Sequence, residues 1–261
     1  MHKLKQFIQL LTKLGFYAIS LTFIIFLATN YIRVQTPFPD SIIETAKKQP
    51  IQTELPAGTE PFSVSIDQDA TYLIGPKYEY QVTGLVVSTH DTQGFWDITH
   101  YRWGDSLNVR DICVLFGESL NSDDYKKINF RSGDYTCFFS WEDPDLQDFN
   151  IFDVANNHLL SENKEIALKL ARIKPGDQIL IKGYLATYSN DKGFFRGTST
   201  TRQDTGDGAC ETIYVKEVEI LKENMPQVNR IYEITKYLLP IELVLLIIFL
   251  FANSYLATKV L

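Results

Sequence analysis

The sequence lacks clustered basic side chains and the motifs of known enzyme classes. The formal net charge of the 261 residues is −7, and Lys and Arg form no patch, whereas binding to nucleic-acid phosphates needs clustered cations. The HExxH zinc pattern is absent, and DTGDG at Asp204–Gly208 lacks the ligand spacing of an EF-hand loop. The sequence therefore predicts no nucleic-acid partner, no cofactor and no bound metal, and it favours a non-enzymatic role.

Charge is also missing from a long stretch near each end of the chain. Leu14–Ile32 holds 19 residues without a charged side chain, and Tyr237–Ala257 carries one, Glu242. A helix of about 20 apolar residues crosses the hydrocarbon core of a bilayer. We therefore expect transmembrane helices at 14–33 and 237–257. A cleaved signal peptide is the alternative for the first, but its apolar stretch is long and residues 28–30 make a poor cleavage site.

The basic residues around the first stretch predict its direction. Lys3, Lys5 and Lys13 precede it, and positive residues favour the cytoplasmic side. Residues 1–13 and 258–261 are then cytoplasmic in a bacterial inner membrane, and residues 34–236 are extracytoplasmic. The expected partners are the lipid bilayer and a membrane or envelope protein. Glu242, about one turn into its helix, is expected at the membrane interface, with a contact to a partner helix as the alternative.

Cysteine is scarce, and all three cysteines lie between the apolar stretches. An extracytoplasmic compartment permits disulfides. Cys113 and Cys137 lie in strand-like segments, so a cross-strand disulfide is feasible if those strands are neighbours. Cys210 is left over, and a buried free thiol is favoured over an interchain bond or a reactive group.

The central region predicts a linker at 34–61, a domain at 62–222 and a connecting helix at 223–236. Proline recurs five times in the linker. Strand patterns occupy 62–66, 71–74, 78–88, 111–116, 135–141, 178–188 and 211–221, and an amphipathic helix capped by Ser161 occupies 161–173. This order predicts a mainly β fold, an OB-like Greek-key barrel with one helix, flanked by the two transmembrane helices. A β-sandwich is the alternative.

One further indication is a resemblance. The segment TSTTRQDTGDGACETIYV at Thr198–Val215, with ANNHLL at 155–160, resembles a group of bacterial membrane-anchored proteins with an OB-like extracytoplasmic domain. The resemblance extends loosely from about Tyr78 to Leu221. It implies no established activity and assigns no catalytic residue.

Two long irregular segments, 89–110 and 189–211, predict where a site lies. In an OB-like barrel the corresponding loops flank the usual binding face, and long loops are often functional. The favoured function is a membrane-anchored binding or assembly module, and the alternative is a hydrolase-like enzyme with its site between these loops. The candidate surface consists of His100, Trp103, Asn157, His158, Arg196, Arg202, Asp204, Asp207 and Glu211.

Three sharper hypotheses compete with simpler structural ones. A metal site at His90 and His100 is less favoured than solvated loop histidines, because their spacing matches no standard ligand pattern. Calcium at Asp204–Gly208 is less favoured than a Gly-rich turn in which Asp204 pairs with Arg202. Catalysis by Cys210 with His158 or His100 lacks a visible activating environment, and Asn157–His158 is expected to be a turn that leads into the helix.

Overall fold

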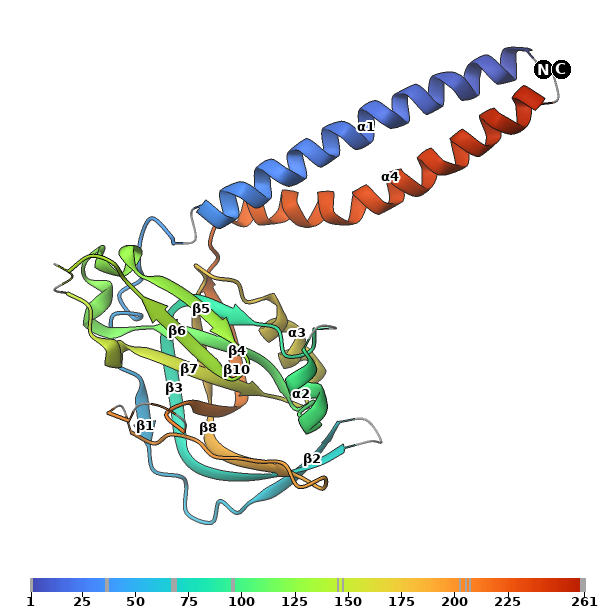
Figure 1. Cartoon of the computed structure of the whole chain (residues 1–261). Coiled ribbons are helices and arrows are strands. Elements are labelled where there is room, and N and C mark those ends of the chain that lie inside the picture. Colours follow the sequence, from blue (N-terminus) through green and yellow to red (C-terminus); the bar gives the residue numbers. More distant parts are fainter. Residues whose placement is uncertain are drawn as a thin grey trace. The chain divides into compact units, whose positions relative to one another are not determined.

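The computed structural model is mixed, with 37% helix and 34% strand. It describes residues 2–35, 38–66, 70–94, 97–144, 146, 148–201, 203–204, 206 and 208–258. The chain divides into two compact units, one formed by residues 1–37 with 225–261 and the other by residues 38–224 (Figure 1). Each unit has its own internal packing.

The first unit is a pair of long helices, α1 (His2–Gln35) and α4 (Pro226–Thr258), which pack against each other (Figure 1). Both are long and apolar enough to cross a membrane. The two apolar terminal helices are therefore confirmed, and each extends beyond the span predicted for it. Pro240 lies within α4.

The helix pair holds the acidic side chain of the second apolar stretch. Thr22 Oγ1 in α1 donates a hydrogen bond to Glu242 Oε1 in α4 at 3.0 Å. The Phe26 ring stacks on Tyr232, with 5.1 Å between centroids. A carboxylate among apolar helices needs a donor, and Thr22 lies near the midpoint of 14–33. Glu242 is thus bound by α1 of its own chain, and its placement at the membrane interface stays a prediction.

The second unit is built on one large sheet. Its strands are β1 (Ile51–Thr53), β2 (Phe62–Ile66), β3 (Ala70–His90), β4 (Asn108–Leu115), β7 (Val154–Leu160), β8 (Gln178–Asn190), β9 (Phe195–Arg196) and β10 (Glu211–Lys222). Their order is β1-β3-β4-β7-β10-β8-β9, with β2 on β3 and a further pairing of β3 with β8. Only β7 and β10, among the described pairs, run parallel. The large sheet is confirmed, but closure into a barrel is not.

A separate hairpin and short helices complete this unit. The hairpin consists of β5 (Asn129–Gly133) and β6 (Thr136–Ser140). The helices are α2 (Ile98–Trp103), α3 (Lys164–Arg172) and the 3₁₀ turns η1 (Gly117–Leu120), η2 (Asp124–Lys127) and η3 (Ile151–Asp153). Asn163 caps α3 by accepting the backbone N–H groups of Glu165 and Ile166. The helix therefore begins later than the predicted Ser161 cap, because the Asn163 side chain takes the capping position.

Two glycines allow strands to approach closely. A Cβ at Gly183 in β8 would lie 2.1 Å from the Tyr214 carbonyl oxygen of β10, and one at Gly84 in β3 would lie 2.4 Å from the Val114 side chain of β4. Any larger residue would push these strands apart. The bulge predicted in the last strand is present, as a register shift between Val215 and Glu217.

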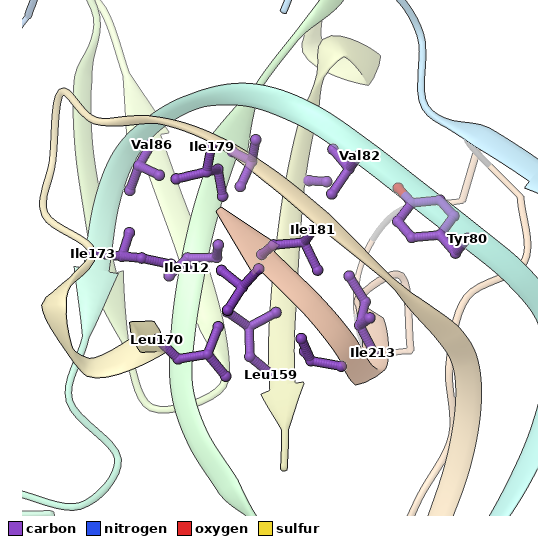
Figure 2. Packing of buried hydrophobic residues seen from close by; sticks show 14 of the residues in the cluster. Tyr80, Val82, Val86, Ile112, Leu159, Leu170, Ile173, Ile179, Ile181 and Ile213 are labelled. Carbon is purple, nitrogen blue, oxygen red and sulfur yellow. The ribbon is translucent and has the colours of Figure 1, made fainter. Parts of the chain in front are cut away.

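The main core lies on one face of these strands. Figure 2 shows Val82, Ile112, Leu159, Ile181 and Ile213 converging from β3, β4, β7, β8 and β10. Leu170 and Ile173, at the end of α3, pack against the same cluster. Fully burying such a side chain contributes about 1.5–3 kcal/mol, so this cluster is the main source of stability of the unit.

Residues 38–61, predicted as part of a linker, belong to the compact second unit. Ala46 is buried, and the Ile43 backbone N–H donates to Gln178 Oε1 at 2.7 Å. β1 adds to the edge of β3. The prolines interrupt regular structure here, but the short apolar segments between them still pack against the domain.

The predicted disulfide between Cys113 and Cys137 is present, with Cα atoms 5.8 Å apart. It joins β4 of the large sheet to β6 of the hairpin, so it links two sheets rather than two neighbouring strands. This bond fastens the β5–β6 hairpin over the face of the sheet opposite to the main core.

Candidate functional site

Polar side chains form a row across three adjacent strands of the sheet. Asp111 of β4 is the register partner of His158 of β7, and His158 is the partner of Thr212 of β10. Cys210 immediately precedes β10. The turn predicted at Asn157–His158 was wrong, because these residues lie inside a central strand. Three consecutive polar residues, Asn156–His158, hide the apolar alternation that marks a strand.

Asp111 and His158 form a fully buried pair. Asp111 Oδ1 lies 2.6 Å from His158 Nδ1, and both side chains have no exposed surface. Burial alone lowers the pKa of His158, but the charge of Asp111 and the hydrogen bonds with Asp111 and Cys210 outweigh it and raise this pKa to about 9. The same partnership holds the pKa of Asp111 below its usual range despite burial.

Cys210 lies close to His158 and Asn156. It is a free thiol, partly buried, and its Sγ accepts a hydrogen bond from Asn156 Nδ2 at 3.2 Å. Burial raises the pKa of a thiol, but here the hydrogen bond with His158 and the charge of His158 lower the pKa of Cys210. A lowered pKa increases the thiolate fraction, which is the nucleophilic form.

Arg196 of β9 completes the polar cluster. Its Nη2 lies 2.7 Å from His158 Nε2, and its guanidinium carbon lies 4.1 Å from the centre of the Tyr135 ring. A neutral His158 with its proton on Nδ1 accepts this bond at Nε2. When Nε2 is protonated it becomes a donor, and Arg196 must then release that nitrogen. The short contact with Arg196 fits the neutral ring, whereas the raised pKa of His158 favours the protonated ring, so the two states differ by one proton on Nε2.

A hollow of about 730 Å³ opens beside Cys210. Asn156, Arg196, Asp204 and Cys210 form a polar part of its wall, and Phe139, Ile151 and Phe152 form an apolar part. His158 and Asp111 lie behind the wall and have no exposed surface. The sulfur is thus the reactive atom that a molecule in the hollow would meet.

Tyr135, in the turn of the β5–β6 hairpin, is fixed in an unusual backbone conformation with φ 56°. Its hydroxyl and that of Tyr188 both donate to Asp105 Oδ2 at 2.7 Å. Burial and the negative charge of Asp105 raise the pKa of Tyr135. The backbone oxygen of Tyr135 lies 3.7 Å from Cys210 Sγ, so the hairpin forms one side of the thiol environment.

A second cluster of titratable groups lies next to this row. Asp97 Oδ2 is 2.7 Å from His90 Nε2 and 2.7 Å from His100 Nδ1. His100 is buried, so the prediction of solvated loop histidines was wrong for it. Asp97 caps α2 and places His100 in its first turn, whereas His90 is the last residue of β3.

The structure divides the residues predicted to form a surface. Arg196, Asp204 and Glu211 line the hollow, and His158 lies directly behind it. Asp204 accepts a hydrogen bond from Ser199 Oγ at 2.7 Å. Arg202 and Asp207 lie outside the described residues. The predicted pair of Asp204 with Arg202 is outside them too, because it includes Arg202.

Three other predicted residues do not line the hollow. Asn157 points away from His158 and donates to the Ala155 carbonyl oxygen at 3.0 Å. Trp103 is exposed, with its ring 6.2 Å from that of Phe194. His100 Nε2 lies 3.7 Å from Asp111 Oδ2. His100 is therefore next to the row of polar side chains, at Asp111, and does not border the hollow.

Three residues of this cluster, Asp111, Asn156 and Tyr135, were not predicted from the sequence. Asp111 carries a signal, because it is a charged residue at the start of the apolar strand DICVLF and a charge in a central strand needs a partner. Tyr135 and Asn156 carry none that separates them from other residues of their type.

No family model, curated protein or solved structure matches this chain. The resemblance to bacterial membrane-anchored proteins therefore stays a prediction, and function must be argued from the site.

Proposed function

We propose that the central domain is a thiol-dependent enzyme that transfers or hydrolyses acyl groups. Cys210 is the nucleophile, His158 is the general base and acid, and Asp111 positions His158. The observation that supports this most strongly is the buried Asp111–His158 pair with Cys210 close by, and of these three residues only Cys210 lines the hollow. A nucleophile, a base and a group that orients the base are the recurring parts of such sites.

The reaction we propose proceeds through a thioester. The Cys210 thiolate adds to the carbonyl carbon of an ester, thioester or amide. The leaving group departs with the proton from His158, and an acyl group remains on the sulfur. His158 then takes a proton from water, the resulting hydroxide displaces the thiol, and the acid product leaves. Each proton that His158 accepts is returned in the following step, so the enzyme ends in its starting state.

The groups around the sulfur support this role. Asn156 Nδ2 lies 3.2 Å from Sγ, and Arg196 lines the same wall. Both carry N–H donors that suit the negative oxygen of a tetrahedral intermediate. The apolar wall of Phe139, Ile151 and Phe152 suits an acyl chain or an apolar side chain of the substrate.

The fold and the location are part of the proposal. Two features support the OB-like interpretation. Five strands follow one another in the order β3, β4, β7, β8 and β10, with α3 between the third and the fourth. In addition, β7 and β10 pair in parallel. The disulfide supports an oxidising compartment such as the periplasm. The enzyme would then act outside the cytoplasm while α1 and α4 anchor it.

The binding or assembly module predicted from the sequence is the second candidate. The observation that favours it is the mixed polar and apolar lining of the hollow, which could hold a ligand without reacting with it. The two candidates differ in what they require of Cys210, since binding alone needs no thiolate.

The test is hydrolysis of a panel of p-nitrophenyl acyl esters by the full chain in detergent. Cys210→Ser and Cys210→Ala should lower kcat/KM at least about 1,000-fold with an unchanged melting temperature, because this side chain is only partly buried. Lys182→Ala, on the exposed side of β8, is the matched control and should keep full activity. A wild-type protein that turns over no ester, or a Cys210→Ala variant as active as wild type, would contradict the proposal.

A further inference from the structure

The side chains of His90, Asp97 and His100 converge without touching the hollow. Their ligand atoms all lie within 4.8 Å of one another. A single carboxylate oxygen, Asp97 Oδ2, stands 2.7 Å from an imidazole nitrogen on each side. The three residues come from the end of β3 and from the cap and first turn of α2, so two elements hold them in place.

We propose that His90 Nε2, Asp97 Oδ2 and His100 Nδ1 bind one divalent transition-metal ion, with zinc as the best fit. Neutral imidazoles and a carboxylate are the ligands that zinc takes in a four-coordinate site. The fourth position can be filled by Asp134, whose Oδ1 lies 3.5 Å from His90 Nε2. Asp134 belongs to the turn of the β5–β6 hairpin, so it reaches the cluster from a third direction.

The surroundings of the three side chains support this assignment. Asp97 Oδ1 accepts the backbone N–H of His100 at 2.9 Å, which orients the carboxylate and leaves Oδ2 for an ion. On the far side of the His100 ring, Nε2 lies 3.3 Å from Asn108 Nδ2 and 3.7 Å from Asp111 Oδ2. A histidine that ligates through one nitrogen commonly gives its other N–H to a carboxylate.

Asp111 supplies an independent observation. It is fully buried, and its Oδ1 accepts from both Asn108 Nδ2 and His158. Its Oδ2 makes no hydrogen bond within the described part of the chain. A buried carboxylate oxygen without a donor is costly. A proton held on His100 Nε2, as metal binding at Nδ1 requires, would satisfy it after a small approach of the two groups.

An ion at this position would join three elements. It would tie the end of β3 to α2 and to the hairpin turn that carries Asp134 and Tyr135. Tyr135 borders Cys210, and its ring lies 4.0 Å from that of His100, centre to centre. The ion therefore has a positioning role for the wall of the hollow, and its binding does not depend on what the thiol does.

The test uses the full chain in detergent, freed of metal by a chelator and titrated with zinc against a chromophoric competitor. Wild type should bind about one equivalent of zinc, and cobalt should give the absorption bands of a tetrahedral site. In His90→Gln and His100→Gln the amide can still donate to Asp97 but is a poor ligand. Because loss of an outer-shell partner alone costs 10–100-fold, these variants should bind more than about 100-fold more weakly.

Two matched variants separate zinc binding at His90, Asp97 and His100 from zinc binding at the thiol and from the enzyme proposal. Asp91→Asn changes the residue next to His90, and Cys210→Ser removes the thiol; both should bind zinc as wild type does. Equal zinc affinity in wild type and His90→Gln would overturn the proposal and leave a hydrogen-bonded cluster. Loss of zinc in Cys210→Ser with retention in His90→Gln would overturn it too, by placing the ion at the thiol. Loss of esterase activity in Cys210→Ser with zinc retained would support the enzyme proposal and the zinc proposal independently of each other.

Discussion

At neighbouring positions in β4 and β7, the two faces are both fully buried but chemically opposite. On one face Ile112 and Leu159 enter the main core, and on the other Asp111 and His158 face each other, all without exposed surface. Neighbouring residues of a strand point to opposite faces. Burial of the apolar pair stabilises the fold, whereas burial of the charged pair is costly unless each group is partnered. Side chains with perturbed pKa values in such a place are candidates for the functional site that we propose.

The largest loss of stability is expected from a cavity on the apolar face. Leu159→Ala removes a fully buried side chain from the core and should lower the free energy of unfolding by about 3 kcal/mol. Urea denaturation followed by circular dichroism measures this. His158→Gln changes the preceding residue, on the polar face, and keeps an amide donor for Asp111. It should therefore cost less stability but abolish ester hydrolysis. Equal effects of the two changes on stability and activity would remove the distinction between the faces.

The disulfide tests how much the polar face depends on the hairpin above it. Cys113 and Cys137 are 24 residues apart, and opening a loop of this length should cost about 3 kcal/mol on the chain-entropy account. A Cys113→Ser, Cys137→Ser double variant should therefore melt at a lower temperature and lose activity as Tyr135 moves away from Cys210. Full activity in the double variant would show that the hairpin is not part of the site.

The buried His158 should make stability depend on pH in a defined direction. Its pKa rises from an ordinary value of about 6.5 to about 9 on folding. A raised pKa adds stability that is complete below about pH 6.5 and is lost as the pH rises through about 9. In a Cys210→Ser background, which removes the titrating thiol, the free energy of unfolding should fall by about 3 kcal/mol between pH 6 and 10.

The same pH series in Cys210→Ser, His158→Gln supplies the control. This double variant should show a much flatter profile over that range. A stability that rises with pH in the Cys210→Ser protein would contradict the assignment of a protonated His158 to the folded state.

The smallest effect is expected on the exposed side of the sheet. Lys182 Nζ lies 3.1 Å from Glu217 Oε2, with both side chains largely exposed. Exposed ion pairs contribute about 0.2–1 kcal/mol. Lys182→Ala should therefore change the free energy of unfolding by less than about 1 kcal/mol. A larger loss would show that burial does not determine how much a substitution in this sheet lowers the free energy of unfolding.

Sequence patterns predicted the parts of the molecule that follow simple periodicity. The apolar helices, β8, β10 and most of β3 alternate or run without charge, and the structure confirms them. β7 was missed for a physical reason. Its middle residues, Asn156–His158, are polar, so the strand lacks the apolar alternation that marks a buried strand.

The site itself could be predicted only in fragments. His158, Arg196 and Cys210 were recognised as reactive or polar residues, but their meeting depends on the register of β4, β7 and β10, which no local pattern encodes. The cluster of His90 with His100 was weighed and set aside because its spacing is irregular. Asp97, between them in the chain, becomes their link only through the cap of α2.

The most direct measurement of the central claim is the pH dependence of Cys210 alkylation. The other two cysteines are joined to each other, so iodoacetamide reports on this thiol alone in mass spectrometry. The midpoint in folded wild type should lie below that of the same protein unfolded in urea, and His158→Gln should move it back up. A folded midpoint at or above the unfolded one, or a midpoint unchanged by His158→Gln, would contradict the account.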